Sequence, residues 1–175
     1  VELKGKTLGI IGIGRIGQAV AEMAIGLGMK VVFYDKFTSE VTINLTFFNG
    51  TTAAFPLKSS TFEEVIQTAD FITLHVPAQE NYIIGEKEFE AMKKDVGIVN
   101  AARGGVIDEV ALLKYIEAGK VLFAGLDVFE SEPKPEIQIL MQPKISLTPH
   151  IGAATLEAQD RIGTELANQI IEILK

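Results

Sequence analysis

The 175-residue sequence predicts an α/β fold, in which a doubly wound parallel sheet carries helices on both faces and an extra β-hairpin is added. Six short segments are almost continuously apolar, as expected of parallel strands covered on both faces. Helical patterns lie between them, and this alternation is typical of βαβ units. The expected strands are residues 7–11, 30–34, 71–76, 97–101, 122–128 and 145–148, and the expected helices are 16–27, 61–69, 86–93, 109–118 and 135–141.

The first strand runs into a glycine-rich turn at residues 12–17 (Gly-Ile-Gly-Arg-Ile-Gly), which opens the first helix. Gly12 allows the tight turn, Gly14 lets the backbone approach a pyrophosphate, and Gly17 lets the helix pack close to the sheet. The helix N-terminus adds free N–H groups and a partial positive charge. The turn therefore predicts a dinucleotide site.

Asp35 ends the second strand, 18 residues after Gly17. A carboxylate there can accept hydrogen bonds from the adenosine ribose and repel a 2′-phosphate, which favours NAD over NADP. The adjacent Lys36 leaves binding of NADP as an alternative. A solvated aspartate at the strand end, with no contact to a cofactor, is the other interpretation of Asp35.

Residues 41–58 interrupt the α/β rhythm with β-branched and aromatic residues on either side of Asn49-Gly50. This pattern predicts a hairpin with a two-residue type I′ turn. It is either a simple excursion from the crossover or a contact between subunits. Ser60 followed by Glu63 predicts a capping box at the start of the next helix.

His75 lies at the end of the third strand, just before Pro77, and a packed or hydrogen-bonding histidine is expected there more than a catalytic one. Residues 100–109 then leave the fourth strand and enter a helix whose expected N-cap is Asp108. Arg103 lies in this loop. Its planar guanidinium suits bidentate binding of a carboxylate, although a surface salt bridge is the alternative.

Acidic residues follow the fifth strand in the segment 125–133, and His150 follows the sixth between Pro149 and a glycine-containing turn. A histidine in such a position can take or give a proton near neutral pH. A nearby acid would hold its ring and favour its charged form. The sequence therefore predicts an acid/base site at this edge of the sheet.

The last segment, residues 155–175, is one long helical pattern with most of its apolar residues on one face. It predicts either a helix packed on the sheet or a connector to another domain. The chain as a whole is expected to form one domain over residues 1–175. Because it begins at Val1 and its first strand follows at once, we expect a processed or excised piece.

Composition excludes several classes of function. A net charge of −7 and a pI near 4.9 argue against a nucleic-acid partner. The chain has no cysteine and only two histidines, so no metal site is expected, and a reducing cytoplasmic location suits it. No apolar stretch predicts a membrane span or a signal peptide.

Together these segments resemble the nucleotide-binding domain of the D-2-hydroxyacid dehydrogenase family. The resemblance rests on residues 12–17, 35, 70–77, 100–109, 125–133 and 148–155, in the order of the family. With Glu157-Ala158-Gln159, the last of these is most similar to the phosphoglycerate dehydrogenase branch, which opens serine synthesis. The resemblance implies a Rossmann-type domain that binds NAD and a small 2-hydroxy or 2-oxo acid.

The resemblance also implies roles for single residues. Arg103 would bind and polarise the 2-oxo acid group, and His150 would be the general acid/base at the C2 oxygen. Glu132 would pair with His150. The nearby Glu130 does not match the family position. The implied contacts to the cofactor are Gly12, Gly14, Arg15, Ile16, Asp35, Val76, Ala101, Ala102, Arg103, Asp127, His150, Ile151, Gly152 and Ala153.

Family members carry a second domain that closes over the substrate, and this chain has no counterpart of it. We therefore expect the isolated chain to bind NAD and to turn over poorly, and we expect a homodimer from the resemblance alone. The alternatives are an NAD-sensing corepressor module on the same fold, or another family member acting on lactate or on glycerate and glyoxylate. A formate dehydrogenase fits less well, since glutamine would be expected in place of Glu132.

Overall fold

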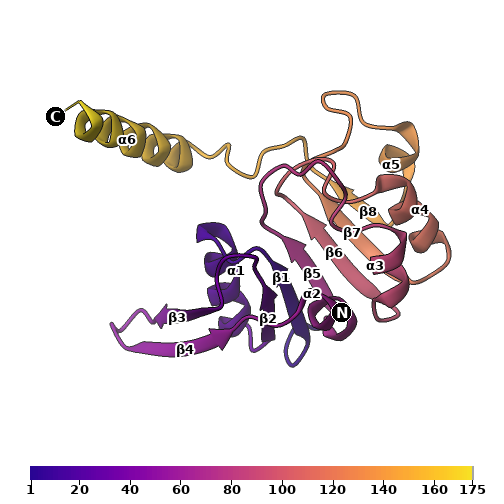
Figure 1. The fold of residues 1–175 in the computed structure, drawn as a ribbon, viewed down its shortest axis with the longest axis horizontal. Coiled ribbons are helices and arrows are strands. Elements are labelled where there is room, and N and C mark those ends of the chain that lie inside the picture. Colours follow the sequence, from indigo (N-terminus) through magenta and orange to yellow (C-terminus); the bar gives the residue numbers. More distant parts are fainter. Residues whose placement is uncertain (175) are drawn as a thin grey trace.

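A computed structural model describes residues 1–174. Its central sheet has six parallel strands in the order β2-β1-β5-β6-β7-β8, and a separate two-stranded antiparallel sheet is formed by β3 and β4 (Figure 1). The predicted doubly wound fold with an added hairpin is confirmed. The strands of the main sheet are β1 (Thr7–Ile11), β2 (Lys30–Tyr34), β5 (Phe71–Leu74), β6 (Val96–Asn100), β7 (Val121–Leu126) and β8 (Ile145–Leu147).

Helices cover the two faces of the sheet unequally. The helices are α1 (Arg15–Gly26), α2 (Phe62–Thr68), α3 (Glu86–Ala91), α4 (Glu109–Glu117), α5 (Ile137–Met141) and α6 (Leu156–Ile173). One core joins α2, α3, α4 and α5 to the sheet, and a second joins α1 and the hairpin to the other face. Successive residues of β1 serve both cores, since Ile10 belongs to the second and Ile11 to the first. Over β6 the α1 face is left open, and Val99 is 39% exposed there.

The strand order places a switch point between β1 and β5. The chain runs from β1 to β2 on one side and later returns to β5 on the other side of β1. Ligands of such sheets bind at the carboxyl ends of the strands near this point. Four strands end earlier than predicted, β5 at Leu74 and β7 at Leu126 by two residues and β6 and β8 by one residue each. His75, Val76 and Asp127 therefore lie in loops at that edge.

The hairpin pairs β3 (Glu40–Thr46) with β4 (Thr52–Lys58), but its turn differs from the predicted type I′. That turn requires positive φ at two residues, and here only Gly50 has it, with φ of 81°. The Gly50 N–H donates to the Phe47 carbonyl, and the Phe47 N–H donates to the Thr51 carbonyl. The loop therefore has three residues and ends in a left-handed glycine.

Helix caps confirm one prediction and correct another. The Asp108 carboxylate accepts a hydrogen bond from the Ala111 N–H, as expected of the N-cap of α4. Helix α2 is capped by Thr61, whose hydroxyl accepts from the Glu64 N–H, and the predicted capping box of Ser60 and Glu63 is wrong. Neighbouring Ser and Thr residues offer the same cap chemistry, so sequence alone left the register open by one residue.

Helix α6 projects away from the sheet rather than packing on it (Figure 1). None of its described residues is buried, and its apolar side chains are exposed. A salt bridge of 2.7 Å joins Glu165 of α6 to Arg15 at the start of α1. No helix within residues 1–174 combines the length and hydropathy needed to cross a membrane.

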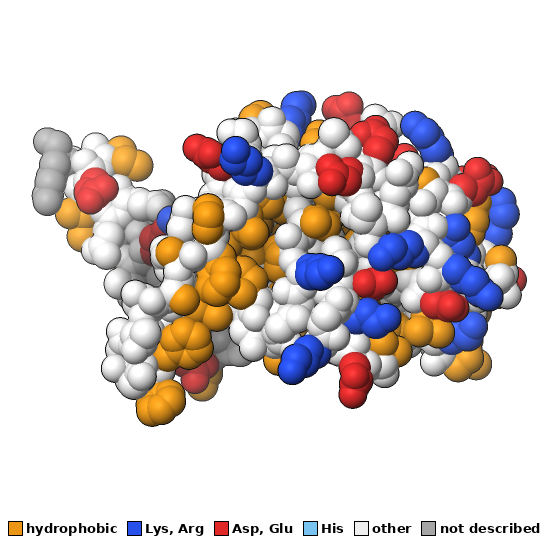
Figure 2. Space-filling model, turned by 90° about the horizontal axis from the view of Figure 1, so that it is seen from below, with side chains coloured by type: hydrophobic (Ala, Val, Ile, Leu, Met, Phe, Trp, Pro, Cys, Tyr) orange, Lys and Arg blue, Asp and Glu red, His pale blue; other side chains and the backbone are white. Residues whose placement is uncertain are grey.

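Figure 2 shows hydrophobic side chains gathered toward the hairpin end of the face seen from below, while charged side chains are scattered over the rest of that face. The exposed hydrophobic residues of the hairpin and its approaches include Phe37, Phe47, Phe48 and Phe55. The hairpin and its approaches therefore present exposed aromatic side chains to solvent.

Candidate active site

The glycine-rich turn has the conformation that the sequence predicts. Gly12 has φ of 95°, and a side chain there would collide with the His75 carbonyl oxygen. A side chain at Gly17 would collide with the Gly12 carbonyl oxygen. At Gly14, by contrast, a Cβ atom would meet nothing within 4 Å. Gly12 and Gly17 are thus required by contacts within the protein, while Gly14 faces open space that a ligand can enter.

Arg15 and Ile16 are the first two residues of α1, and both are exposed. The first turn of α1 contains no acidic residue, so its free N–H groups carry an uncompensated partial positive charge. This environment suits the phosphates of a dinucleotide. The Arg15 guanidinium is held by Glu165, an exposed pair that an anionic ligand can displace.

Asp35 lies beside the glycine turn, where its carboxylate fixes the backbone. Its Oδ2 accepts from the Ile13 N–H at 2.8 Å, and its Oδ1 accepts from the N–H groups of Phe37 and Thr38 at 2.8 and 3.0 Å. Burial raises the pKa of Asp35, but these hydrogen bonds outweigh it and leave the pKa below its ordinary value. An ionised acceptor therefore stands at the end of β2, as a ribose site requires.

The loops after β5 and β6 lie at the same edge of the sheet as the glycine turn. The Val76 side chain lies 3.0 Å from the position a Cβ atom of Gly12 would take. Ala101 is exposed and Ala102 is buried. The Ala102 N–H donates to Oδ1 of Asn100, and Nδ2 of Asn100 donates to the Arg103 carbonyl. Asn100 thus shapes the Arg103 loop, a role that sequence reasoning missed although a buried polar residue at a strand end is its signal.

Arg103 is exposed at the carboxyl end of β6. Its Nη1 donates to the Ala102 carbonyl at 2.6 Å. Within residues 1–174 no salt bridge engages its guanidinium, and no hydrogen bond links it to His150 or Glu132. The described residues therefore do not form the surface salt bridge that was the alternative for Arg103. Its guanidinium remains available to bind the carboxylate of a ligand.

Asp127 organises the turn that carries His150. Its Oδ1 accepts from the Thr148 hydroxyl at 2.6 Å and the Ile151 N–H at 2.8 Å, and its Oδ2 accepts from the Gly152 N–H at 2.7 Å. Burial raises the pKa of Asp127, but these hydrogen bonds hold it below its ordinary value. The structure thus gives Asp127 an anchoring role that the sequence did not predict, and its implied contact with the cofactor stays a prediction. Ala153 is exposed at the end of the same turn.

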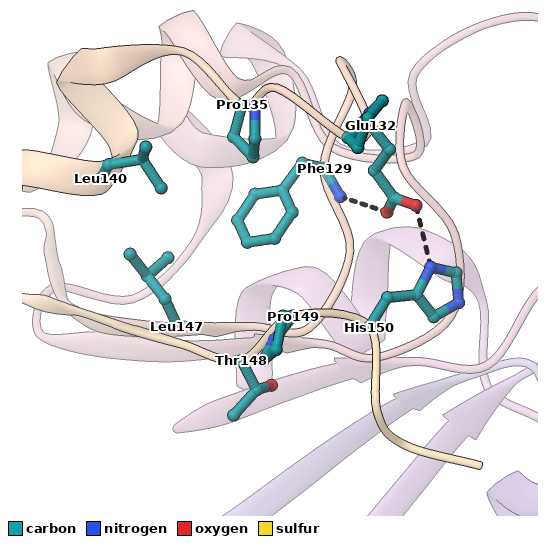
Figure 3. A pocket seen from close by; sticks show the side chains of 9 residues that line it. Phe129, Glu132, Pro135, Leu140, Leu147, Thr148, Pro149 and His150 are labelled. Atoms are coloured by element: carbon teal, nitrogen blue, oxygen red, sulfur yellow. Dashed lines mark hydrogen bonds and ion pairs between the residues drawn. The ribbon is translucent and has the colours of Figure 1, made fainter. Parts of the chain in front are cut away.

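His150 and Glu132 form the pair that the sequence resemblance implies. The Nδ1 atom of His150 lies 2.9 Å from Oε2 of Glu132, and Oε1 of Glu132 accepts from the Phe129 N–H at 3.0 Å (Figure 3). Both bonds lower the pKa of Glu132, with the His150 bond the larger cause. An ionised carboxylate only accepts hydrogen bonds, so Nδ1 carries the proton and Nε2 is left facing away from Glu132.

A hollow of about 370 Å³ lies behind this pair. Its apolar walls include Phe129, Pro135, Leu140, Leu147 and Pro149, and the His150 ring points away from them (Figure 3). The pair therefore borders an apolar hollow and is itself partly exposed to solvent.

His75 makes a hydrogen bond, as expected from the sequence. Its Nε2 lies 3.1 Å from the Thr73 hydroxyl, and burial lowers its pKa. The carbonyl oxygen of His75 also lies so close to Gly12 that no side chain fits at that position. His75 is thus a structural neighbour of the glycine turn.

A doubly wound parallel sheet with a glycine-rich turn at its switch point is typical of dinucleotide-binding domains. A histidine paired with a carboxylate at the same edge of the sheet suits the proton transfer of an oxidoreductase. Residues 1–152 match the NAD binding domain of the D-isomer specific 2-hydroxyacid dehydrogenases. The chain belongs to this family, and NAD is its cofactor. The resemblance noted in the sequence is confirmed.

Relatives with different substrates in their names are similar to the chain. A hydroxypyruvate reductase of Thermotoga maritima is 43% identical over 99% of this chain and 54% of its own length. A D-3-phosphoglycerate dehydrogenase of Bacillus subtilis is 40% identical over 99% of this chain and 32% of its own. The crystal structure of a glyoxylate reductase from Paecilomyes thermophila superposes with a TM-score of 0.84 at 36% identity, covering 100% of this chain and 51% of that one. The chain thus spans about half, or less, of the relatives it matches.

Proposed function

We propose that the chain is the NAD-binding half of an enzyme that interconverts a D-2-hydroxy acid and its 2-oxo acid. The observation that carries the proposal is the hydrogen bond between His150 and Glu132, at the carboxyl edge of the sheet and next to the Arg103 loop. A histidine oriented in this way can exchange a proton at the C2 oxygen near neutral pH.

In the proposed reaction Glu132 holds the Nδ1–H of His150, so that the free electron pair on Nε2 is directed at the substrate hydroxyl. NAD, when bound, supplies the hydride acceptor for the hydrogen on C2. His150 takes the hydroxyl proton as the C2–O bond becomes a carbonyl, and Arg103 holds the acid group through paired N–H donors. In the reverse direction His150 returns the proton to the oxygen.

The proposed substrate is D-3-phosphoglycerate, supported by the segment 148–155 and by the relative from Bacillus subtilis. Hydroxypyruvate reduction is the second candidate, because the relative from Thermotoga maritima carries that name. Reduction of hydroxypyruvate gives glycerate, which differs from D-3-phosphoglycerate by the absence of the phosphate group. An NADH-linked screen of phosphoglycerate, glycerate, lactate and 2-hydroxyglutarate on the longer protein tests the assignment. A kcat/KM for glycerate above that for phosphoglycerate would favour the second candidate.

Replacement of His150 tests the chemical role directly. We expect His150→Ala to abolish turnover while the affinity for NAD stays within about tenfold, or about 1.4 kcal/mol. His75→Ala is the matched control, since His75 contacts Thr73 rather than the pair. Full activity in His150→Ala would contradict the acid/base assignment.

A regulatory module that senses NAD is the alternative from another class. It predicts binding of a partner protein that depends on NAD, whereas the enzyme predicts appearance of NADH. We also propose a homodimer, which sedimentation of the protein tests. A sedimentation coefficient of a monomer at micromolar concentration would contradict it.

A further inference from the structure

Two glutamates outside the proposed chemistry hold each other's backbones. Glu109 is the first residue of α4, and Glu130 lies in the loop after β7. The Glu109 N–H donates to Oε1 of Glu130 at 2.9 Å, and the Glu130 N–H donates to Oε1 of Glu109 at 2.8 Å. Because each carboxylate accepts the other's amide, the two segments close into a ring of charge-assisted hydrogen bonds, here called the glutamate clasp.

The clasp joins the two loops that carry the proposed chemistry. Glu109 ends the loop of Arg103, and Glu130 is two residues before Glu132. The loops also touch at Gly104, where any side chain would collide with the Phe129 carbonyl oxygen. A third loop is attached by Tyr82, whose hydroxyl donates to Oε2 of Glu130 at 3.1 Å.

Burial of Glu109 is costly for an acid without a cation. Glu109 is 7% exposed, and its Oε2 is buried without a hydrogen-bond partner among residues 1–174. Burial raises its pKa, and the charges of Glu130 and Glu136 raise it further. The nearby Lys114 pairs with Glu86 instead. An apolar residue at position 109 would avoid this desolvation cost. The Glu109 carboxylate is therefore better explained by the loop geometry that it holds than by a gain in stability.

We propose that Glu109 and Glu130 are positioning residues, whose clasp holds Glu132 in hydrogen-bonding range of His150 and in register with the Arg103 loop. The Glu132 side chain is 36% exposed, and its only other hydrogen bond among the described residues is from the Phe129 N–H. The loop geometry therefore decides whether its carboxylate meets the ring. The consequence for turnover rests on the proposed function, whereas the geometric effect does not.

Nitrogen-15 NMR of the two histidines tests the proposal without substrate. At about pH 8.5, where an ordinary imidazole is neutral, the His150 shifts report whether Nδ1 or Nε2 carries the proton. We expect Nδ1–H in the parent protein and loss of this preference in Glu130→Ala and Glu109→Ala, with His75 unchanged as the internal reference. Glu130 is exposed, so its alanine variant keeps the test available if Glu109→Ala fails to fold.

Conservative variants separate the clasp from a general loss of structure. Glu109→Gln and Glu130→Gln each keep an oxygen acceptor, and we expect both to keep the Nδ1–H form. Glu117→Ala, on the exposed side of α4, is the matched control. An unchanged tautomer in Glu130→Ala, or its loss in both glutamine variants, would overturn the proposal.

The second test is the kinetics of a protein that is longer than this chain. We expect Glu130→Ala to lower kcat by about 10–100-fold and to leave NAD affinity unchanged, with recovery in Glu130→Gln. A tautomer effect without any dehydrogenase activity in the parent would refute the proposed function and leave the clasp intact. Equal kcat in Glu130→Ala and the parent would overturn the link to catalysis.

Discussion

At the scale of single residues, the backbone of His150 is held in an uncommon conformation. Its φ of 56° lies in the left-handed region, which costs a non-glycine residue about 1–2 kcal/mol. Asp127 offsets this cost through its bonds to the two following N–H groups, those of Ile151 and Gly152. The strain is therefore located at the proposed acid/base residue, as is common in functional sites.

Asp127→Asn should loosen this turn. An amide offers one oxygen in place of two, and its NH₂ group would face an N–H donor, so we expect a loss of about 2 kcal/mol in unfolding free energy at neutral pH. Because the folded pKa of Asp127 lies below its ordinary 3.8, its contribution is complete above that value and is lost as pH falls through the folded pKa. Urea titrations at neutral and acid pH measure the difference. A gap between parent and variant that persists in acid would contradict this origin.

Glu109→Gln should have the opposite dependence on pH. Since the folded pKa of Glu109 is raised, the parent is stabilised below the ordinary 4.5 and loses that stability as pH rises through the folded pKa. We therefore expect the variant to have the higher Tm at pH 7, by about 2–4 °C for each kcal/mol gained. The advantage should disappear below the ordinary value, as thermal scans at both pH values would show. A lower Tm at pH 7 would mean that the charged form is needed.

At the scale of elements, the hairpin is part of the core rather than a loose excursion. Ile43 and Leu45 point from β3 toward α1 and are buried, while Thr42 and Asn44 alternate to the exposed side. From β4, the partly buried Leu57 packs against the same cluster. A hydrophobic face of this kind ties the hairpin to the nucleotide-binding half of the sheet.

Paired substitutions in β3 test this packing. We expect Ile43→Ala to cost about 2–4 kcal/mol of unfolding free energy, as for other buried aliphatic truncations. Thr42→Ala, one residue away on the exposed side, should cost less than about 1 kcal/mol. Chemical denaturation measures both. Equal losses in the two variants would show that the hairpin does not contribute to the core.

The doubly wound sheet, the glycine turn and the pairing of Glu132 with His150 could be predicted because each depends on local pattern or on a family motif. The turn of the hairpin could not, since Asn49-Gly50 fits two loop lengths that only pairing across the strands distinguishes. The anchoring role of Asp127 was missed for a similar reason. Its partners lie 21 to 25 residues away, beyond any periodicity in the sequence.

At the scale of the whole molecule, the proposed site is open to solvent in this chain. Arg103, Glu132 and His150 are all exposed at the edge of the sheet. We expect calorimetry to show NAD binding by this chain, and we expect its turnover to be far below that of a longer protein, because substrate is held on one side and water has access. Comparable rates from both would contradict this expectation.

The place of β8 in the sheet has a consequence for how activity is lost. This three-residue strand has β7 as its one neighbour, and His150 follows it by three positions. Edge segments with few hydrogen bonds open locally at lower free energy than the global transition. Amide hydrogen exchange should therefore be faster in β8 than in β1 or β5. On warming, the protein would lose the geometry of its acid/base pair before its fold, so that inactivation precedes melting.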